Sequence, residues 1–130
     1  MAVDDVRSGF RRSWSDLASV GRNTAGGYDR FAWTRTDHDL REWFAGEASD
    51  LGLDLTTDRV GNQWAWWGDP YAAGAAPAVV TGSHLDSVPS GGAFDGPLGV
   101  VSSLLAVPSL RAAGHRLDRP MAVVHFVDEE

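Results

Sequence analysis

The sequence predicts an α/β fold with a mixed sheet, and two kinds of pattern carry this prediction. Apolar residues at helical spacing occupy residues 1–20, 36–50 and 95–113. Short alternating or apolar runs, typical of strands, occupy residues 53–56, 62–67, 78–81 and 121–127. Because a helix separates the last two strands while the first two adjoin each other, a mixed sheet is favoured over a purely antiparallel one.

The first two helices are predicted from one apolar stripe each. In the first, the stripe consists of Val6, Phe10, Trp14 and Leu17, and we assign this packing helix no chemistry. The second helix is expected to begin at Thr36 as N-cap and to end at Gly52. Its buried face should hold Leu40, Trp43, Phe44, Ala48 and Leu51.

The strands are predicted from alternation and from turn residues. A turn at 58–61 joins the first two strands into a hairpin. The second strand carries Trp64, Trp66 and Trp67, which we expect in core and edge packing; a stacking platform for a base or sugar is the alternative, disfavoured because no Lys or Arg is near them in the sequence. The apolar run 78–81 is typical of a strand inside a sheet.

The last helix and strand complete the pattern. The helix beginning at or just after Asp95 is apolar on most sides, which predicts burial against the sheet. Pro108 is expected to kink or divide it, and Gly114 to end it. Residues 121–127 are expected to form a central strand.

Composition restricts the classes of partner. The 130 residues include no cysteine, which excludes disulfides and thiolate metal sites. The net charge of -7 disfavours nucleic acid and anionic membranes as partners and is compatible with a cation site. No secretory signal and no run long enough to span a bilayer is visible, so a cytoplasmic location is expected.

Ionisable side chains gather where two of the predicted strands end. His84 and Asp86 follow the apolar run 78–81, and residues two apart in extended chain point to the same side. The Asp86 carboxylate could therefore hold one ring nitrogen of His84 and aim the other at a metal. Asp95 lies at a helix start, and Glu129 and Glu130 follow the last strand. Imidazole and carboxylates together favour a metal site.

Each of these residues also has a purely structural interpretation. His84 could be a hydrogen-bonded loop histidine, Asp86 could cap a turn, and Asp95 could cap the following helix. The glutamate pair could be a solvated acidic end. Taken together, the five residues favour the metal site, with Gly96 and Gly99 small so that backbone and ions can approach. The remaining histidines are not assigned as ligands: His38, an exposed His115 and a packed or hydrogen-bonded His125.

Three motifs carry a family resemblance. They are Gly-Ser-His-Leu-Asp-Ser-Val at 82–88, Gly-Gly-Ala-Phe-Asp-Gly-Pro-Leu-Gly-Val at 91–100 and Asp-Glu-Glu at 128–130. The chain resembles the M20 metallo-amidohydrolases, in the branch of allantoate amidohydrolases, N-carbamoyl-L-amino acid hydrolases and beta-ureidopropionases. Residues 26–34 and 58–68 are more similar to the allantoate members.

The resemblance implies a role for each site residue. His84 would ligate one divalent ion, Asp95 would bridge two, and Glu130 would ligate the other. Glu129 would act as general base on a water bridging the ions, and Asp86 would orient His84. Zn²⁺ or Mn²⁺ is implied, with Co²⁺ or Ni²⁺ able to substitute. A cis peptide bond after Asp95 is also implied.

The resemblance further implies that residues 1–130 are the N-terminal portion of one zinc-peptidase-like (phosphorylase/hydrolase-like) catalytic domain. Two more histidine ligands and a lid domain, through which the full-length protein would dimerise, are expected beyond Glu130. We therefore expect the chain alone to be inactive toward a small ureido substrate. The alternatives are an aminopeptidase or dipeptidase of the same superfamily, and a catalytically silent truncated product.

Overall fold

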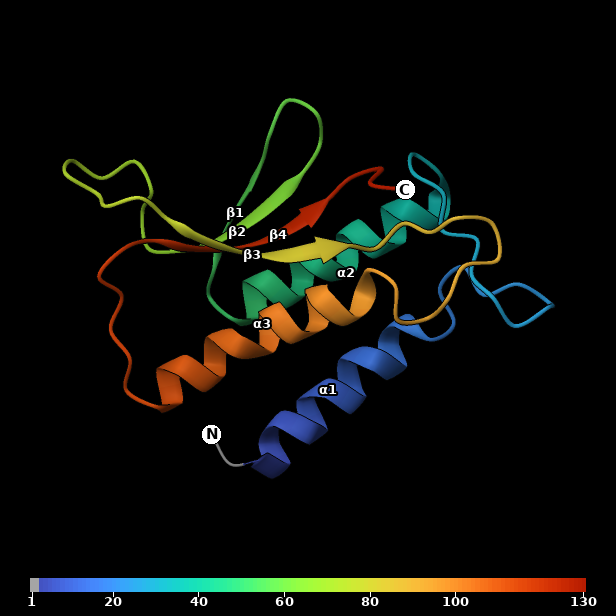
Figure 1. Cartoon of the computed structure of the whole chain (residues 1–130), viewed down its shortest axis with the longest axis horizontal. Helices are drawn as coiled ribbons and strands as arrows, with labels where there is room; N and C mark the ends of the chain where they lie inside the picture. Colours follow the sequence, from blue (N-terminus) through green and yellow to red (C-terminus); the bar gives the residue numbers. More distant parts are fainter. Residues whose placement is uncertain (1–2) are drawn as a thin grey trace.

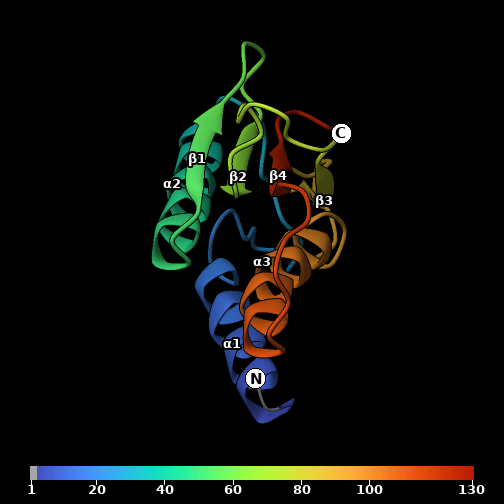
Figure 2. The same cartoon turned by 90° about the vertical axis from the view of Figure 1, so that its left-hand side faces the viewer.

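A four-stranded sheet with three helices on one face forms the part of the chain that the structure describes, residues 3–130 of a computed structural model (Figure 1). The elements are α1 (Val3–Leu17), α2 (Arg35–Asp50), β1 (Asp54–Thr57), β2 (Gln63–Trp67), β3 (Val79–His84), α3 (Pro97–Ala112) and β4 (Met121–Phe126). Viewed from the side, α2 lies beside β1 and β2, and α1 lies beyond α3 on the side away from the sheet (Figure 2). The predicted α/β class with a mixed sheet is confirmed.

The strand order is β1-β2-β4-β3. The hairpin β1–β2 is antiparallel, β2 pairs antiparallel with β4, and β4 pairs parallel with β3. Parallel neighbours need a crossover connection, and α3 supplies it. Because β3 and β4 run in the same direction, their carboxyl ends meet at one edge of the sheet, and the two chain segments that follow them start side by side (Figure 1).

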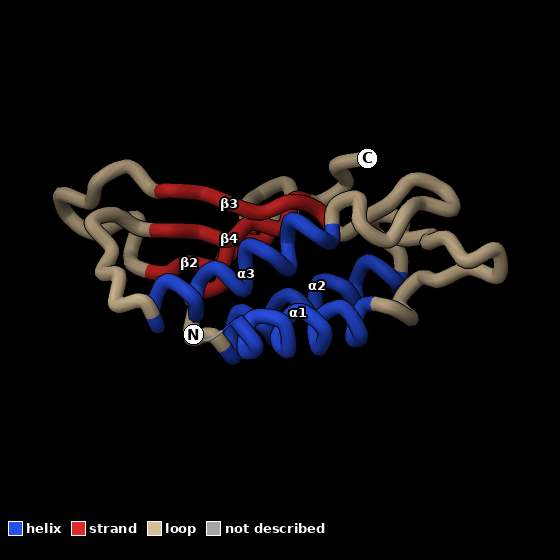
Figure 3. The backbone as a smooth tube through the Cα atoms, turned by 60° about the horizontal axis from the view of Figure 1, so that its bottom comes forward, coloured by secondary structure: helices blue, strands red, loops and turns tan. Residues whose placement is uncertain are grey.

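The hydrophobic core lies between the sheet and its helices. Leu40 and Phe44 of α2 and Val100 of α3 are fully buried there, with Val123 of β4 opposite them. The predicted buried face of the second helix is confirmed, with Trp43 and Leu51 partly buried at its margin. No helix of the described chain covers the opposite face of the sheet (Figure 3). There Trp64 and Trp66 stack at 6.0 Å between ring centroids, and Trp64 meets Phe126 edge-on.

The start of α2 was predicted wrongly, whereas α3 starts just after Asp95, as predicted. The N-cap of α2 is Thr34 rather than Thr36, since the Thr34 hydroxyl accepts from the backbone N–H of Asp37 at 3.4 Å. Helix α3 begins at Pro97, so Asp95 does not cap it; the N-cap is Gly96, whose φ of 90° favours glycine. Proline at the first helical position has no N–H to leave unpaired, which explains the start.

Pro108 does not divide α3, which continues to Ala112. Of the two effects expected of Pro108, a kink or a division of the helix, division is excluded. Ser109 follows the proline directly. Its hydroxyl donates to the Leu105 carbonyl, one turn earlier in the helix, at 2.8 Å.

The apolar strand predicted inside the sheet lies at its edge. β3 pairs only with β4 among the described residues, and Val79 and Val80 are about half exposed. It also extends to His84, beyond the predicted end at residue 81, so His84 belongs to the strand and not to a loop. None of the helices formed by residues 3–130 has the length and apolar character to cross a membrane.

Candidate metal centre

The site forms where β3 and β4 end, and the structure brings three of the predicted ligands together there. One donor atom each of His84, Asp95 and Glu130 lies within 4.8 Å of the other two. His84 is the last residue of β3, Asp95 lies two residues before α3, and Glu130 follows β4. His84 is buried whereas the two carboxylates are exposed, so the cluster opens to solvent on its acidic side.

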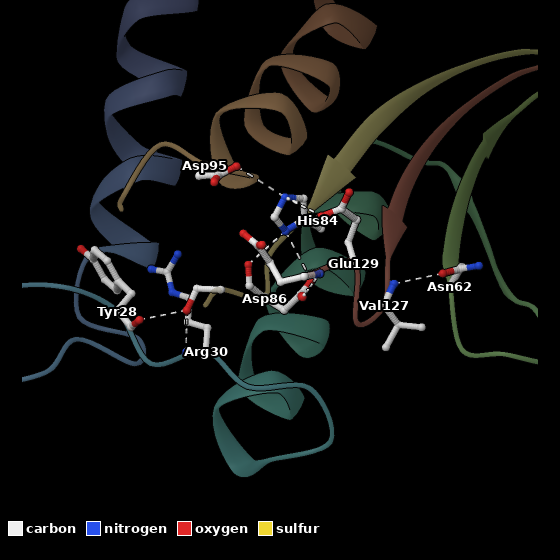
Figure 4. Close-up of polar contacts among 10 residues, drawn as sticks. Tyr28, Arg30, Asn62, His84, Asp86, Asp95, Val127 and Glu129 are labelled. Atoms are coloured by element: carbon white, nitrogen blue, oxygen red, sulfur yellow. Dashed lines mark hydrogen bonds and ion pairs between the residues drawn. The ribbon is translucent and has the colours of Figure 1, made fainter. Parts of the chain in front are cut away.

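The imidazole of His84 is held in one tautomer. Its Nδ1 lies 3.0 Å from the backbone carbonyl of Asp86. A carbonyl oxygen only accepts, so Nδ1 donates this hydrogen bond, which leaves Nε2 facing the carboxylates. That Nε2 lies 3.7 Å from an Asp95 oxygen and 3.5 Å from a Glu129 oxygen (Figure 4). Ligands about 2.0–2.1 Å from one tetrahedral ion are separated by roughly 3.4 Å, which is close to the 3.7 Å between His84 Nε2 and the Asp95 oxygen.

Asp86 contacts both sides of the site. The orienting contact expected from its carboxylate comes first from its backbone carbonyl, while the carboxylate oxygen Oδ1 lies 3.4 Å from His84 Nδ1. Its other oxygen accepts the backbone N–H of Glu130 at 3.0 Å. This residue, only 3 % exposed, thus ties the end of β3 to the segment after β4 (Figure 4).

The small size of Gly96 and Gly99 serves protein contacts. A Cβ at Gly96 would lie 2.5 Å from the carbonyl of His84 and 2.7 Å from its ring, and a Cβ at Gly99 would lie 2.7 Å from that of Ser83. The start of α3 therefore packs directly on the end of β3. The peptide bond after Asp95 is trans, as are the others between described residues, so the expectation of a cis bond there is wrong.

The chain leaving β4 is fixed by a residue that sequence reasoning missed. Asn62, just before β2, accepts the backbone N–H of Val127 at 2.9 Å (Figure 4). Its partner lies in a distant part of the sequence, so no local pattern signals this contact. The effect is to set the direction in which residues 128–130 leave the sheet.

A cavity adjoins the acidic side of the cluster. It has a volume of about 290 Å³, and its walls include Asp86, Glu130, Phe31, Trp33 and Val88. The aromatic residues come from the irregular segment after α1, which the sequence did not connect with the site. A small polar molecule could therefore reach Glu130 through a partly apolar opening.

The other histidines lie outside this cluster. His125 is fully buried, and its Nδ1 lies 2.9 Å from the side-chain oxygen of Gln63. Burial, with a smaller contribution from the positive charge of Arg41, lowers the pKa of His125 to about 4, which keeps the ring neutral. His115 is exposed, as expected. His38 shares an exposed face of α2 with Asp39 and Glu42, at helical spacing that brings such groups together without a metal.

Comparison with known proteins gives this cluster a context. No protein-family model matches the chain. It is 34% identical over 122 residues to a ureidoglycolate hydrolase of Oryza sativa, covering 94% of this chain and 25% of the relative. It is 35% identical over 118 residues to an N-carbamoyl-L-amino-acid amidohydrolase of Rhizobium meliloti, covering 91% of this chain and 28% of the relative. An allantoate amidohydrolase of Bacillus subtilis is 31% identical, covering 88% of this chain and 27% of the relative.

Solved structures agree with these relatives. A hydantoinase/carbamoylase family amidase of Burkholderia ambifaria superposes with a TM-score of 0.84 at 41% identity, covering 95% of this chain and 30% of that one. The chain thus spans under a third of the length of each of these relatives. In sequence and in fold, this chain belongs to the family of amidohydrolases that includes the hydantoinase/carbamoylase amidases and the N-carbamoyl-amino-acid and allantoate amidohydrolases.

Proposed function

We propose that the chain supplies half of the metal centre of an amidohydrolase that cleaves a C–N bond of a small linear ureido compound, such as allantoate or an N-carbamoyl-L-amino acid. The observation that carries the proposal is the cluster of His84, Asp95 and Glu130, with Nδ1 of His84 bonded to the Asp86 carbonyl and Nε2 facing the carboxylates. The names of the relatives support the substrate class.

The donor set fits a divalent cation of intermediate softness. One imidazole and several carboxylate oxygens suit Zn²⁺ and Mn²⁺, and Co²⁺ or Ni²⁺ can replace them. We propose that His84, Asp95 and Glu130 would hold two such ions together with further ligands from polypeptide outside these 130 residues, and that Asp95 would serve both ions. When bound, the ions act as Lewis acids that polarise the scissile carbonyl and acidify a water molecule.

Within this scheme the protein's own groups have separate tasks. Glu129 lies 3.5 Å from His84 Nε2, and its side chain is half exposed at the rim. It is therefore placed to take a proton from the attacking water and to pass it to the leaving nitrogen. Asp86 fixes the positions of His84 and Glu130 relative to each other, the first through its carbonyl and the second through its carboxylate.

Titration of the purified chain with Mn²⁺ or Zn²⁺ in a calorimeter tests the proposal. We expect saturable binding that is lost in His84→Ala and weakened at least about 10-fold in Asp95→Asn, since each removes a ligand. His115→Ala is the matched control, because it removes an exposed histidine outside the site. Binding that is unchanged in His84→Ala would refute the site.

Hydrolysis gives a second measurement. With Mn²⁺ added, the chain alone should release no ammonia from allantoate above the buffer rate, because the proposed ligand set is incomplete within it. Turnover well above buffer would show that residues 1–130 suffice and would overturn the proposal that ligands from elsewhere complete the centre.

A further inference from the structure

The loop between His84 and Asp95 is attached to a segment far away in the sequence. Ser87, which follows Asp86 directly, donates its hydroxyl to the Tyr28 carbonyl at 2.9 Å and accepts the Arg30 backbone N–H at 3.0 Å. Its own backbone N–H donates to the Arg30 carbonyl at 3.0 Å. Tyr28 also pairs with Gly91 through two backbone hydrogen bonds. A single buried serine therefore makes three of the contacts that hold this loop.

The segment to which Ser87 binds is itself fixed to the end of α1. The Arg30 guanidinium is buried and donates to the carbonyls of Val20 and Leu17 at 2.9 and 2.7 Å, which satisfies acceptors at the end of this helix. It also lies 4.0 Å from the centre of the Tyr28 ring, whose hydroxyl donates to the Ala18 carbonyl. Helix α1, which carries no ligand, thereby provides the base for the loop.

Asp86, the residue before Ser87, contacts the cluster directly. Asp86 accepts the Nδ1 proton of His84 at its backbone carbonyl and the backbone N–H of Glu130 at its carboxylate. A shift of residue 86 would therefore break both hydrogen bonds, the one that orients the His84 ring and the one that holds the Glu130 backbone. The Asp86 carbonyl and the Ser87 N–H belong to the same peptide unit. The hydrogen bond from this N–H to the Arg30 carbonyl therefore helps to set the direction of the Asp86 carbonyl.

We propose that Ser87 and Arg30 are positioning residues that set the divalent-metal affinity of the site by fixing Asp86 against α1. This inference rests on the proposed function, because it requires that His84, Asp95 and Glu130 bind a metal. Groups that orient metal ligands from behind commonly account for 10–100-fold in affinity, and the same range is expected here. Neither Ser87 nor Arg30 is a metal ligand in this scheme.

The test compares Mn²⁺ affinity among the wild-type chain and three variants by calorimetry at 10 °C. Ser87→Ala should bind Mn²⁺ about 10-fold more weakly than the wild-type chain. Arg30→Lys keeps the charge but loses the forked contact with two carbonyls, so it should weaken binding in the same direction. Ser13→Ala is the matched control: it removes another buried serine hydroxyl, which contacts Glu47 at 3.4 Å, away from the site.

A second readout separates positioning from general destabilisation. In the metal-free wild-type chain, ¹⁵N NMR of the imidazole should show the proton of His84 on Nδ1, and Ser87→Ala should shift part of it to Nε2. Ser13→Ala should lower the melting temperature without changing either readout.

If the wild-type chain binds no Mn²⁺, the proposed function itself fails. If it binds, and folded Ser87→Ala and Arg30→Lys bind equally well, or Ser13→Ala weakens binding as much, the positioning role is overturned.

Discussion

The buried His125 predicts how stability depends on pH. Its pKa is about 4 in the folded protein, against about 6.5 in the unfolded chain. Between these values the unfolded chain binds a proton that the folded protein does not, so the free energy of unfolding falls as pH falls from about 6.5 to 4. The difference of about 2.5 pKa units corresponds to about 3 kcal/mol at the lower end.

In His125→Phe this part of the pH dependence should disappear. The lost hydrogen bond to Gln63 lowers stability at every pH, so the informative quantity is the slope of the free energy of unfolding between pH 7 and 4. Urea unfolding at several pH values measures it. His115→Ala, which removes an exposed histidine, should keep the slope of the wild-type chain. Equal slopes in wild type and His125→Phe would contradict the argument.

Gly96 is the residue on which the contact between His84 and α3 depends. With a φ of 90°, a side chain there is strained, and a Cβ would meet both the carbonyl and the ring of His84. Gly96→Ala should cost more than about 2 kcal/mol of stability and weaken metal binding. Gly92→Ala, in the same loop with open space around it, should change stability by less than about 0.5 kcal/mol. Chemical denaturation of both variants checks the contrast.

At the scale of elements, helix α2 holds a glycine with no structural use. Gly46 lies inside the helix, and a Cβ there would meet nothing within 4 Å. Gly46→Ala should therefore raise the free energy of unfolding by about 0.5–1 kcal/mol through helix propensity and reduced freedom of the unfolded chain. Gly52 follows the same helix in equally open space but with a φ of 64°, so Gly52→Ala should lower stability instead. A melt of each variant distinguishes the two signs.

The elements themselves were largely predictable from the sequence, because apolar spacing and turn residues act over a few positions. The neighbours of each strand were not: the run at residues 78–81 shows only apolar character, whereas the edge position of β3 depends on which strand pairs beside it. The same limit applies to the site. His84 and Asp86 were connected by their spacing, but the contacts of Ser87 with Tyr28 and of Asn62 with Val127 join segments with no shared pattern.

On the scale of the whole molecule, the site depends on parallel pairing of β3 and β4. Ligands after adjacent parallel strands converge at the carboxyl edge of an α/β sheet, where such folds commonly bind their ligands. The same arrangement leaves the far side of β3 unpaired among the described residues, with Val79 and Val80 about half exposed. The other edge of the sheet is β1, which pairs antiparallel with β2. The site is thus built beside an apolar strand edge of the kind that other chains can pair with.

That edge predicts self-association of the chain. Backbone groups on the open side of β3 can pair with a second copy, and the exposed valines add apolar contact. The wild-type chain should therefore show a weight-average mass that rises with concentration in sedimentation equilibrium. Val80→Lys should reduce this rise, because a charge on an edge strand opposes pairing. Val60→Lys places the same charge on an exposed valine of the β1–β2 turn, away from β3, and should leave association unchanged. A wild-type chain that stays monomeric at all concentrations, with a cooperative melt, would show that the edge is protected without a partner.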